Sequence, residues 1–137
     1  MDKQISCIEK LKLIKSGKLS SEDNIKNFIS KIEKDNKKIN AVLSLNKNAL
    51  NEAKEVDKKI KAGKIGRLAG LGFIVKANIC VKDLEINCAS KTLEGWKAPY
   101  DASVIKKIKN EGGIIIGIAN MDEFACGGSG ETSAFGP

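Results

Sequence analysis

Two short apolar runs, Phe73-Ile74-Val75 and Ile114-Ile115-Ile116, constrain the fold of this chain more than any other feature. Neither run alternates with polar residues, which is typical of strands that are covered on both faces. Between the two runs, Asp101 is placed to cap a helix that would stop at Gly112 or Gly113. A strand, a helix and a second strand in this order predict a parallel crossover within an α/β sheet.

The first half of the chain is predicted to be mainly helical. Apolar residues recur with helical spacing within residues 5–14, 25–32 and 49–60. Ser20 followed by Asp23 resembles a capping box at the start of the second helix, and Gly63 is expected to end the third. Residues 41–45 are a candidate for a short strand. These stripes carry no reactive groups, so they predict helices that pack on a sheet.

The composition is that of an ordinary folded domain. The chain has 137 residues, of which 42% are apolar and 30% are charged. This is enough for one compact domain. No apolar run approaches the roughly 18 residues that cross a bilayer, and residues 1–6 lack the apolar core of a signal peptide. We therefore expect a cytoplasmic protein with no membrane partner.

The sequence lacks histidine and the closely spaced cysteine pairs of common zinc sites. The cysteines are Cys7, Cys80, Cys88 and Cys126, they form no CxxC pair, and the sequence contains no histidine. Zinc sites built from cysteine and histidine, and catalysis by histidine, therefore lack their parts. We expect no metal site and four free thiols in a reducing compartment.

Positive charge is concentrated in the first half of the chain. Residues 1–68 hold 17 lysines and arginines against 9 acidic residues, and residues 69–137 hold 7 against 8. A basic half is typical of a surface that faces RNA. The alternative is a solvated helical face with pairs of opposite charge four residues apart. No RNA-binding motif accompanies the charge, so the sequence alone leaves both interpretations open.

Lys76 is the strongest candidate for chemistry. It directly follows the apolar run 73–75, at the end of a strand that should lie inside the protein. Burial disfavours a charged ammonium group, and a neutral lysine amine can act as a base. The alternative is that Lys76 marks the point where the strand leaves for solvent.

Several segments in the second half resemble the amidase-signature family. They are Val75-Lys76-Ala77-Asn78, Asn87-Cys88-Ala89-Ser90, Pro99-Tyr100-Asp101-Ala102 and Asn120-Met121-Asp122-Glu123-Phe124-Ala125. The last segment resembles, within that family, the A subunits of glutamyl-tRNA(Gln) amidotransferases. The resemblance implies N-terminal helices followed by part of a mixed, largely parallel sheet. Residues 1–137 would be the N-terminal portion of one amidase domain, with 1–66 mainly helical and 67–137 α/β with the lysine strand.

The resemblance also implies a site. In this family a lysine at such a strand end is the base of a Ser-Ser-Lys triad, which makes Lys76 the catalytic residue. Ala77 stands where the family has aspartate. The glycine-rich stretch Gly127, Gly128 and Ser129 would lie beside the substrate pocket.

The implied reaction is hydrolysis of glutamine to release ammonia. A partner subunit would use ATP and Mg²⁺ to convert glutamyl-tRNA(Gln) to glutaminyl-tRNA(Gln), so the expected partners are the B and C subunits, that tRNA and glutamine. No cofactor is expected on this chain itself.

The two serine motifs of the family do not occur in the sequence. We therefore expect a fragment that is inactive alone or, as the alternative, a truncated non-catalytic module that binds tRNA or a partner subunit.

Overall fold

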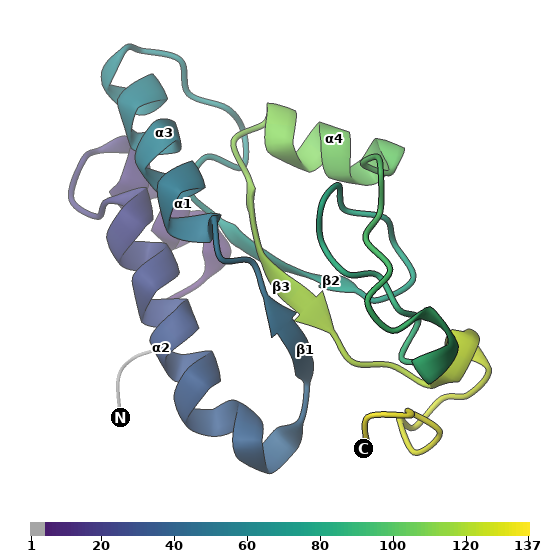
Figure 1. The fold of residues 1–137 in the computed structure, drawn as a ribbon. Coiled ribbons are helices and arrows are strands. Elements are labelled where there is room, and N and C mark those ends of the chain that lie inside the picture. The colour runs from purple at the N-terminus through teal and green to yellow at the C-terminus, as the bar shows by residue number, and fades with distance from the viewer. Residues whose placement is uncertain (1–4) are drawn as a thin grey trace.

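The computed structural model describes residues 5–137 of the chain (Figure 1). In chain order its elements are α1 (Cys7–Lys15), α2 (Ser21–Ile39), β1 (Val42–Leu45), α3 (Ala49–Lys61), β2 (Gly72–Lys76), η1 (Lys91–Leu93), α4 (Ser103–Asn110), β3 (Ile114–Ala119) and η2 (Glu123–Ala125). Helices α1, α2 and α3 lie on one side of the sheet, and α4 with the long loop after β2 lies on the other (Figure 1). The predicted α/β class is confirmed. None of the helices among residues 5–137 has both the length and the apolar character needed to cross a membrane.

The three strands form one mixed sheet in the order β1-β3-β2. β2 and β3 run parallel, and β1 pairs antiparallel with β3. Because α4 connects β2 to β3, the predicted parallel crossover is present. β3 is the central strand, and within residues 5–137 β2 has a neighbour along one edge only.

Both faces of β3 are buried in apolar clusters. Ile114 and Ile116 pack toward α2 and α3, whereas Ile115 and Ile118 pack on the side of α4 and the loop after β2. Strict alternation would place Ile118 on the same face as Ile116. The pairing with β2 skips one residue before Gly117, so the side chains beyond this point change faces.

Helix α2 begins and helix α3 ends where the sequence predicts. The Ser20 hydroxyl accepts a hydrogen bond from the backbone N–H of Asp23, as the capping box predicts. Helix α3 ends at Lys61, and Gly63 just beyond it has the left-handed φ of +77° that glycine adopts readily.

The prediction that Asp101 caps α4 was wrong. The residue before α4 is Ala102, and the helix starts without a side-chain cap. The Asp101 carboxylate instead accepts a hydrogen bond from the N–H of Lys82 at 2.8 Å and forms an ion pair with Lys109 Nζ at 2.9 Å. Asp101 lies one residue too early to act as the cap, so it ties the long loop to the last turn of α4.

The prediction that both apolar runs are covered on both faces is right for β3 and wrong for β2. Residues 114–118 are buried, whereas Ile74 of β2 is 43% exposed. The reason is position in the sheet. β2 is an edge strand, and a groove separates Ile74 from α2.

Candidate functional site

Lys76 is the last residue of β2 and lies at the carboxyl end of the parallel strand pair. It is level with Ala119 at the end of β3, and the N–H of Ala77 donates to the Ala119 carbonyl at 3.2 Å. The Lys76 side chain is exposed, so the expectation that the strand buries it was wrong. Val75 enters the core on one face, and alternation directs Lys76 with Ile74 to the opposite, partly open face.

Asn120 fixes the carboxyl end of β3. Its side-chain amide donates to the carbonyls of Asn40 at 3.0 Å and Gly136 at 2.8 Å, and its oxygen accepts from the Ser133 hydroxyl at 2.7 Å. Asn40, directly after α2, donates in turn to the carbonyls of Phe135 and Gly136. The end of α2, the end of β3 and the C-terminal residues therefore meet at the same end of the sheet as the lysine.

A strained turn, Asn87–Ser90, lies beside the end of the lysine strand. Its central residues Cys88 and Ala89 both have left-handed backbones, with φ of +51° and +53°. The Cys88 N–H donates to the carbonyl of Ala77, and the Cys88 carbonyl accepts from the N–H of Phe124, each at 3.0 Å. The turn therefore joins the residue after Lys76 to the segment that follows β3.

A second strained turn, Glu123–Cys126, faces the first. Phe124 and Ala125 have φ of +51° and +62°, and the N–H of Cys126 closes the turn on the Glu123 carbonyl at 3.0 Å. Left-handed conformations cost non-glycine residues about 1–2 kcal/mol each. Such strain is concentrated at functional sites, so two linked turns of this kind mark this corner as a candidate site.

The glycine-rich loop that follows, residues 126–132, wraps around the carboxylate of Asp122. The carboxylate accepts hydrogen bonds from the Gly130 N–H at 2.9 Å and the Thr132 hydroxyl at 2.8 Å. The Gly130 N–H, followed by the Thr132 hydroxyl, lowers the pKa of Asp122. A Cβ at Gly127 would come within 2.5 Å of this carboxyl group, so the loop needs glycine there. The sequence did not predict this role of Asp122 in holding the loop.

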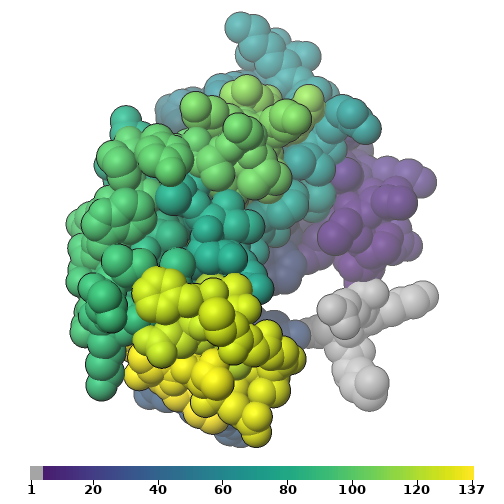
Figure 2. All heavy atoms as spheres, turned by 90° about the vertical axis from the view of Figure 1, so that its right-hand side faces the viewer, coloured from purple at the N-terminus to yellow at the C-terminus, as the bar shows by residue number. Residues whose placement is uncertain are grey.

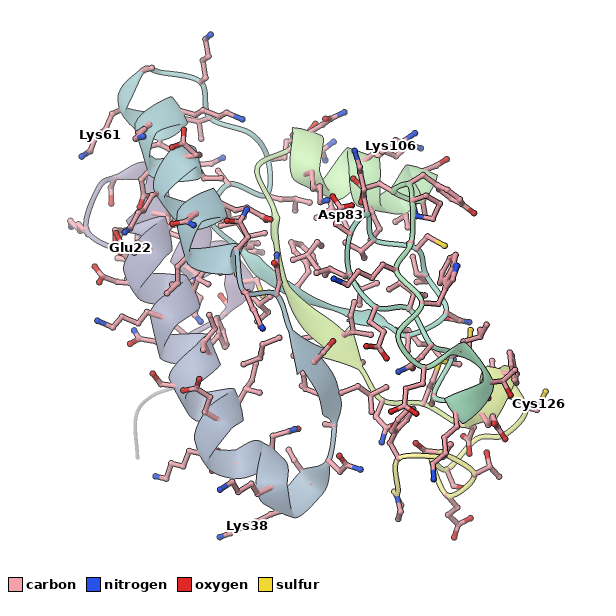
Figure 3. All side chains as sticks on the ribbon, in the orientation of Figure 1. Glu22, Lys38, Lys61, Asp83, Lys106 and Cys126 are labelled. Atoms are coloured by element: carbon pink, nitrogen blue, oxygen red, sulfur yellow. The ribbon has the colours of Figure 1, made fainter. Side chains whose placement is uncertain are left out.

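The three predicted substrate-binding residues, Gly127, Gly128 and Ser129, lie together on the exposed part of this loop. Ser129 donates to the Glu131 carboxylate at 2.8 Å, and a side chain at Gly128 would meet open space. In Figure 3 the neighbouring Cys126 lies at the outer margin of the molecule. Figure 2 shows the C-terminal segment, in yellow, against the green loop that follows β2.

The other candidate nucleophiles near the site already have structural partners. The Ser90 hydroxyl accepts a hydrogen bond from the Thr92 N–H, and the Ser133 hydroxyl is bound to Asn120. All four cysteines are free, as predicted, and burial raises the pKa of the Cys88 thiol. A protonated thiol is a poor nucleophile. Lys76, at the same end of the sheet, has an exposed side chain.

Comparison with known proteins identifies the family. The family model described as Amidase matches residues 23–137. The chain belongs to the amidase family. The glutamyl-tRNA(Gln) amidotransferase A subunit from Methanothermobacter thermautotrophicus is 47% identical over 136 residues, which is 98% of this chain and 30% of that relative. This amidase chain therefore spans about 30% of the length of that curated relative.

Solved amidase-family structures have the same arrangement. The glutamyl-tRNA(Gln) amidotransferase A subunit from Thermotoga maritima superposes with a TM-score of 0.76 and 28% identity, over 98% of this chain and 26% of that one. The native peptide amidase from Stenotrophomonas maltophilia superposes with a TM-score of 0.84 and 25% identity, over 88% of this chain and 26% of that one. The helices and mixed sheet described above are thus part of the amidase-signature fold.

Proposed function

We propose that this amidase-family chain is the lysine-bearing part of the A subunit of a glutamyl-tRNA(Gln) amidotransferase. One observation carries the proposal: a relative with that name is 47% identical across 98% of the chain. The position of Lys76 supports it, since ligands of open α/β sheets bind beyond the carboxyl ends of parallel strands.

In the proposed reaction a serine outside this chain attacks the side-chain amide of glutamine and ammonia leaves. A second serine passes the proton of the nucleophile to the neutral Lys76 amine, which acts as the base, and the same route returns this proton to the departing nitrogen so that it leaves as ammonia. Water then hydrolyses the glutamyl ester on the first serine and releases glutamate. Gly127, Gly128 and Ser129 would border the bound glutamine. Their loop is held in shape by the Asp122 carboxylate, which would fix their position without itself reacting.

The remaining steps belong to other subunits in this proposal. Ammonia would pass to a B subunit, assembled with a C subunit, where ATP and Mg²⁺ activate the glutamyl group on the tRNA. The chain itself would bind neither ATP nor metal. The proposed setting is the cytoplasm.

The test uses a chimera in which the part of the M. thermautotrophicus relative that follows the matched region is joined after Pro137. The chimera should release ammonia from glutamine, and the 137-residue chain alone should not exceed a buffer blank. A folded chimera that leaves glutamine intact would contradict the proposal, as would ammonia release from the chain alone.

A second candidate function follows from the charge. The basic first half of the sequence forms α1, α2 and α3 on one side of the sheet (Figure 1), and Figure 3 shows Lys38 and Lys61 projecting from the lower end of α2 and the upper end of α3. A non-catalytic module could present this side to tRNA or to a partner subunit. Binding of purified chain to tRNA that weakens steeply with added salt would favour this function.

A further inference from the structure

Basic side chains gather at the end of the fold where the parallel strands begin. The loops that lead into β2 and β3 meet here, because the N–H of Gly70 donates to the carbonyl of Gly112 at 3.0 Å. Residues 15–23 and 54–67, which adjoin these loops, hold eight basic and four acidic side chains. In Figure 3 Lys61 projects from the upper end of the molecule, and Lys38 lies at the lower end. Lys76, at the carboxyl end of β2, lies away from this region.

Hydrogen bonds hold the segments of this end together. Asp57 of α3 accepts from the backbone N–H groups of Ser21 and Glu22 at 2.7 and 3.1 Å, which ties α3 to the turn between α1 and α2. The carboxylate of Glu111, directly after α4, accepts from the N–H of Arg67 at 2.8 Å. The basic side chains therefore project from a hydrogen-bonded framework.

The acidic side chains of these segments already have partners. Glu22 pairs with Lys54 at 3.4 Å, and Glu55 pairs with Lys58 at 2.7 Å. The other two acidic residues accept hydrogen bonds at the start of α2. Six basic side chains remain that are exposed and form no ion pair among residues 5–137, and they form the basic end of the chain: Lys15, Lys18, Lys59, Lys61, Lys64 and Arg67.

Helix termini offset only part of this charge. Lys15 lies in the last turn of α1, and Lys59 and Lys61 lie in the last turn of α3. The free carbonyl groups of each helix C-terminus are equivalent to about half of a negative elementary charge. The two termini together therefore offset about one of the six cations, and most of the positive charge faces solvent.

The chemistry of the basic end fits the phosphate backbone of a nucleic acid. Five of its six residues are lysines, whose ammonium groups bind phosphates as point charges on flexible stems. Lysine is depleted in interfaces between proteins, whereas interfaces with nucleic acids are polar and strongly positive. This composition favours a nucleic acid over an acidic protein as the partner.

We propose that the basic end binds the phosphate backbone of RNA, at the opposite end of the sheet from Lys76. The inference deepens the second candidate function, on which it rests for tRNA as the RNA, and it is independent of the glutaminase assignment. The second candidate function uses the whole helical side of the sheet, whereas here the contact is assigned to six residues at one end.

The test measures binding of a tRNA transcript to the 137-residue chain by fluorescence anisotropy, between about 50 and 200 mM salt. The triple variant Lys59→Gln, Lys61→Gln and Lys64→Gln removes three charges at exposed positions, so the fold should tolerate it. Binding should weaken at least ten-fold. The slope of log K against log salt should fall by about two to three, because each lost phosphate contact removes about 0.7–0.9.

The matched control removes the same charge from the other end of the molecule (Figure 3). It is the triple variant Lys34→Gln, Lys37→Gln and Lys38→Gln, at exposed lysines near the end of α2. The control should weaken binding less than about three-fold and change the salt slope by less than one. Equal weakening by the two triple variants would overturn the inference, since binding would then follow net charge alone, as it would in an unfolded chain.

Two further results would overturn it. One is a wild-type chain that does not bind tRNA. The other is displacement of tRNA by polyglutamate as effectively as by unlabelled tRNA, which would assign the basic end to an acidic protein.

The same variants separate this inference from the proposed functions. If both triple variants weaken tRNA binding equally, tRNA binding stands but its place at the basic end does not. In the chimera, the variant at positions 59, 61 and 64 should release ammonia from glutamine at the wild-type rate, because the basic end lies away from Lys76. A chimera that never releases ammonia would contradict the glutaminase assignment and leave the RNA surface standing.

Discussion

The carboxylate of Asp57 on α3 accepts a hydrogen bond from the backbone N–H of Ser21, 2.7 Å away at the start of α2. Its second oxygen accepts from the N–H of Glu22 at 3.1 Å. One side chain of α3 thus satisfies two of the N–H groups that the first turn of α2 leaves without partners in the helix. This contact joins the two helices that cover the face of the sheet on which Lys76 lies.

Replacing Asp57 with Ala should lower the free energy of unfolding by about 1–2 kcal/mol, since it removes a charged cap from two N–H groups. Urea denaturation followed by circular dichroism measures the change. The matched control is Glu55→Ala on the same helix, because Glu55 forms only an exposed ion pair with Lys58, and such pairs contribute about 0–1 kcal/mol. Equal effects of the two changes would show that Asp57 does not act as a cap.

For Ser21 we expect the opposite effect of an alanine substitution on stability. Its hydroxyl is completely buried and, within the part of the chain that is described, has no hydrogen-bond partner. A buried hydroxyl without a partner costs about 1–3 kcal/mol. Ser21→Ala should therefore raise the urea midpoint or leave it unchanged, whereas Ser20→Ala, which removes the N-cap of α2, should lower it. A clear loss of stability in Ser21→Ala would contradict this assignment.

The ion pair between Asp101 and Lys109 predicts a dependence of stability on pH. Burial alone would raise the pKa of Asp101, but the hydrogen bond from the Lys82 N–H and the contacts with Lys109 outweigh burial and lower this pKa. Stabilisation by the pair is therefore complete above the unfolded-state pKa of about 3.9, and it is lost as the pH falls through the lower folded-state value.

Lys109→Met should consequently reduce stability at pH 7 and flatten the decline in stability on acidification. Unfolding midpoints measured from neutral pH down to about pH 3 test this, with Lys107→Met as the control because Lys107 is an exposed lysine on the same helix. Parallel pH profiles for wild type and Lys109→Met would rule out a role for the pair.

Asp122 predicts a local effect on the glycine-rich loop. Asp122→Ala removes the acceptor for the Gly130 N–H and the Thr132 hydroxyl, so the loop should open while the sheet stays intact. Hydrogen exchange of residues 127–132 should become at least about ten-fold faster, with exchange in β3 unchanged. Glu131→Ala, which removes only the exposed partner of Ser129, is the control and should change exchange much less.

The sequence predicts the elements of this fold better than it predicts its site. The run Ile114-Ile115-Ile116 is correctly predicted as a buried strand, because residues that are apolar on both faces leave few alternatives. The same pattern at Ile74 fails, since an apolar run does not reveal whether its strand lies at the centre or the edge of a sheet. For this reason the sequence places Lys76 at the correct strand end but wrongly predicts that it is buried.

The strained turns could not be predicted from local sequence. Left-handed turns are usually signalled by glycine or asparagine, and Cys88-Ala89 and Phe124-Ala125 contain neither. Their geometry is held by contacts across the chain, such as the hydrogen bond between the Phe124 N–H and the Cys88 carbonyl. Only the assembled structure shows these contacts.

Lys76 can be tested as a base by comparing two substitutions in the chimera. Lys76→Arg keeps the positive charge and much of the length, but guanidinium does not lose its proton in proteins. If the amine must accept a proton, Arg should lower glutamine hydrolysis about as severely as Ala, by at least about 100-fold. Lys97→Arg, at an exposed lysine on the loop after β2, is the matched control and should keep full activity. An Arg variant at position 76 that folds normally and stays within a few-fold of wild type would show that Lys76 supplies charge and not a base.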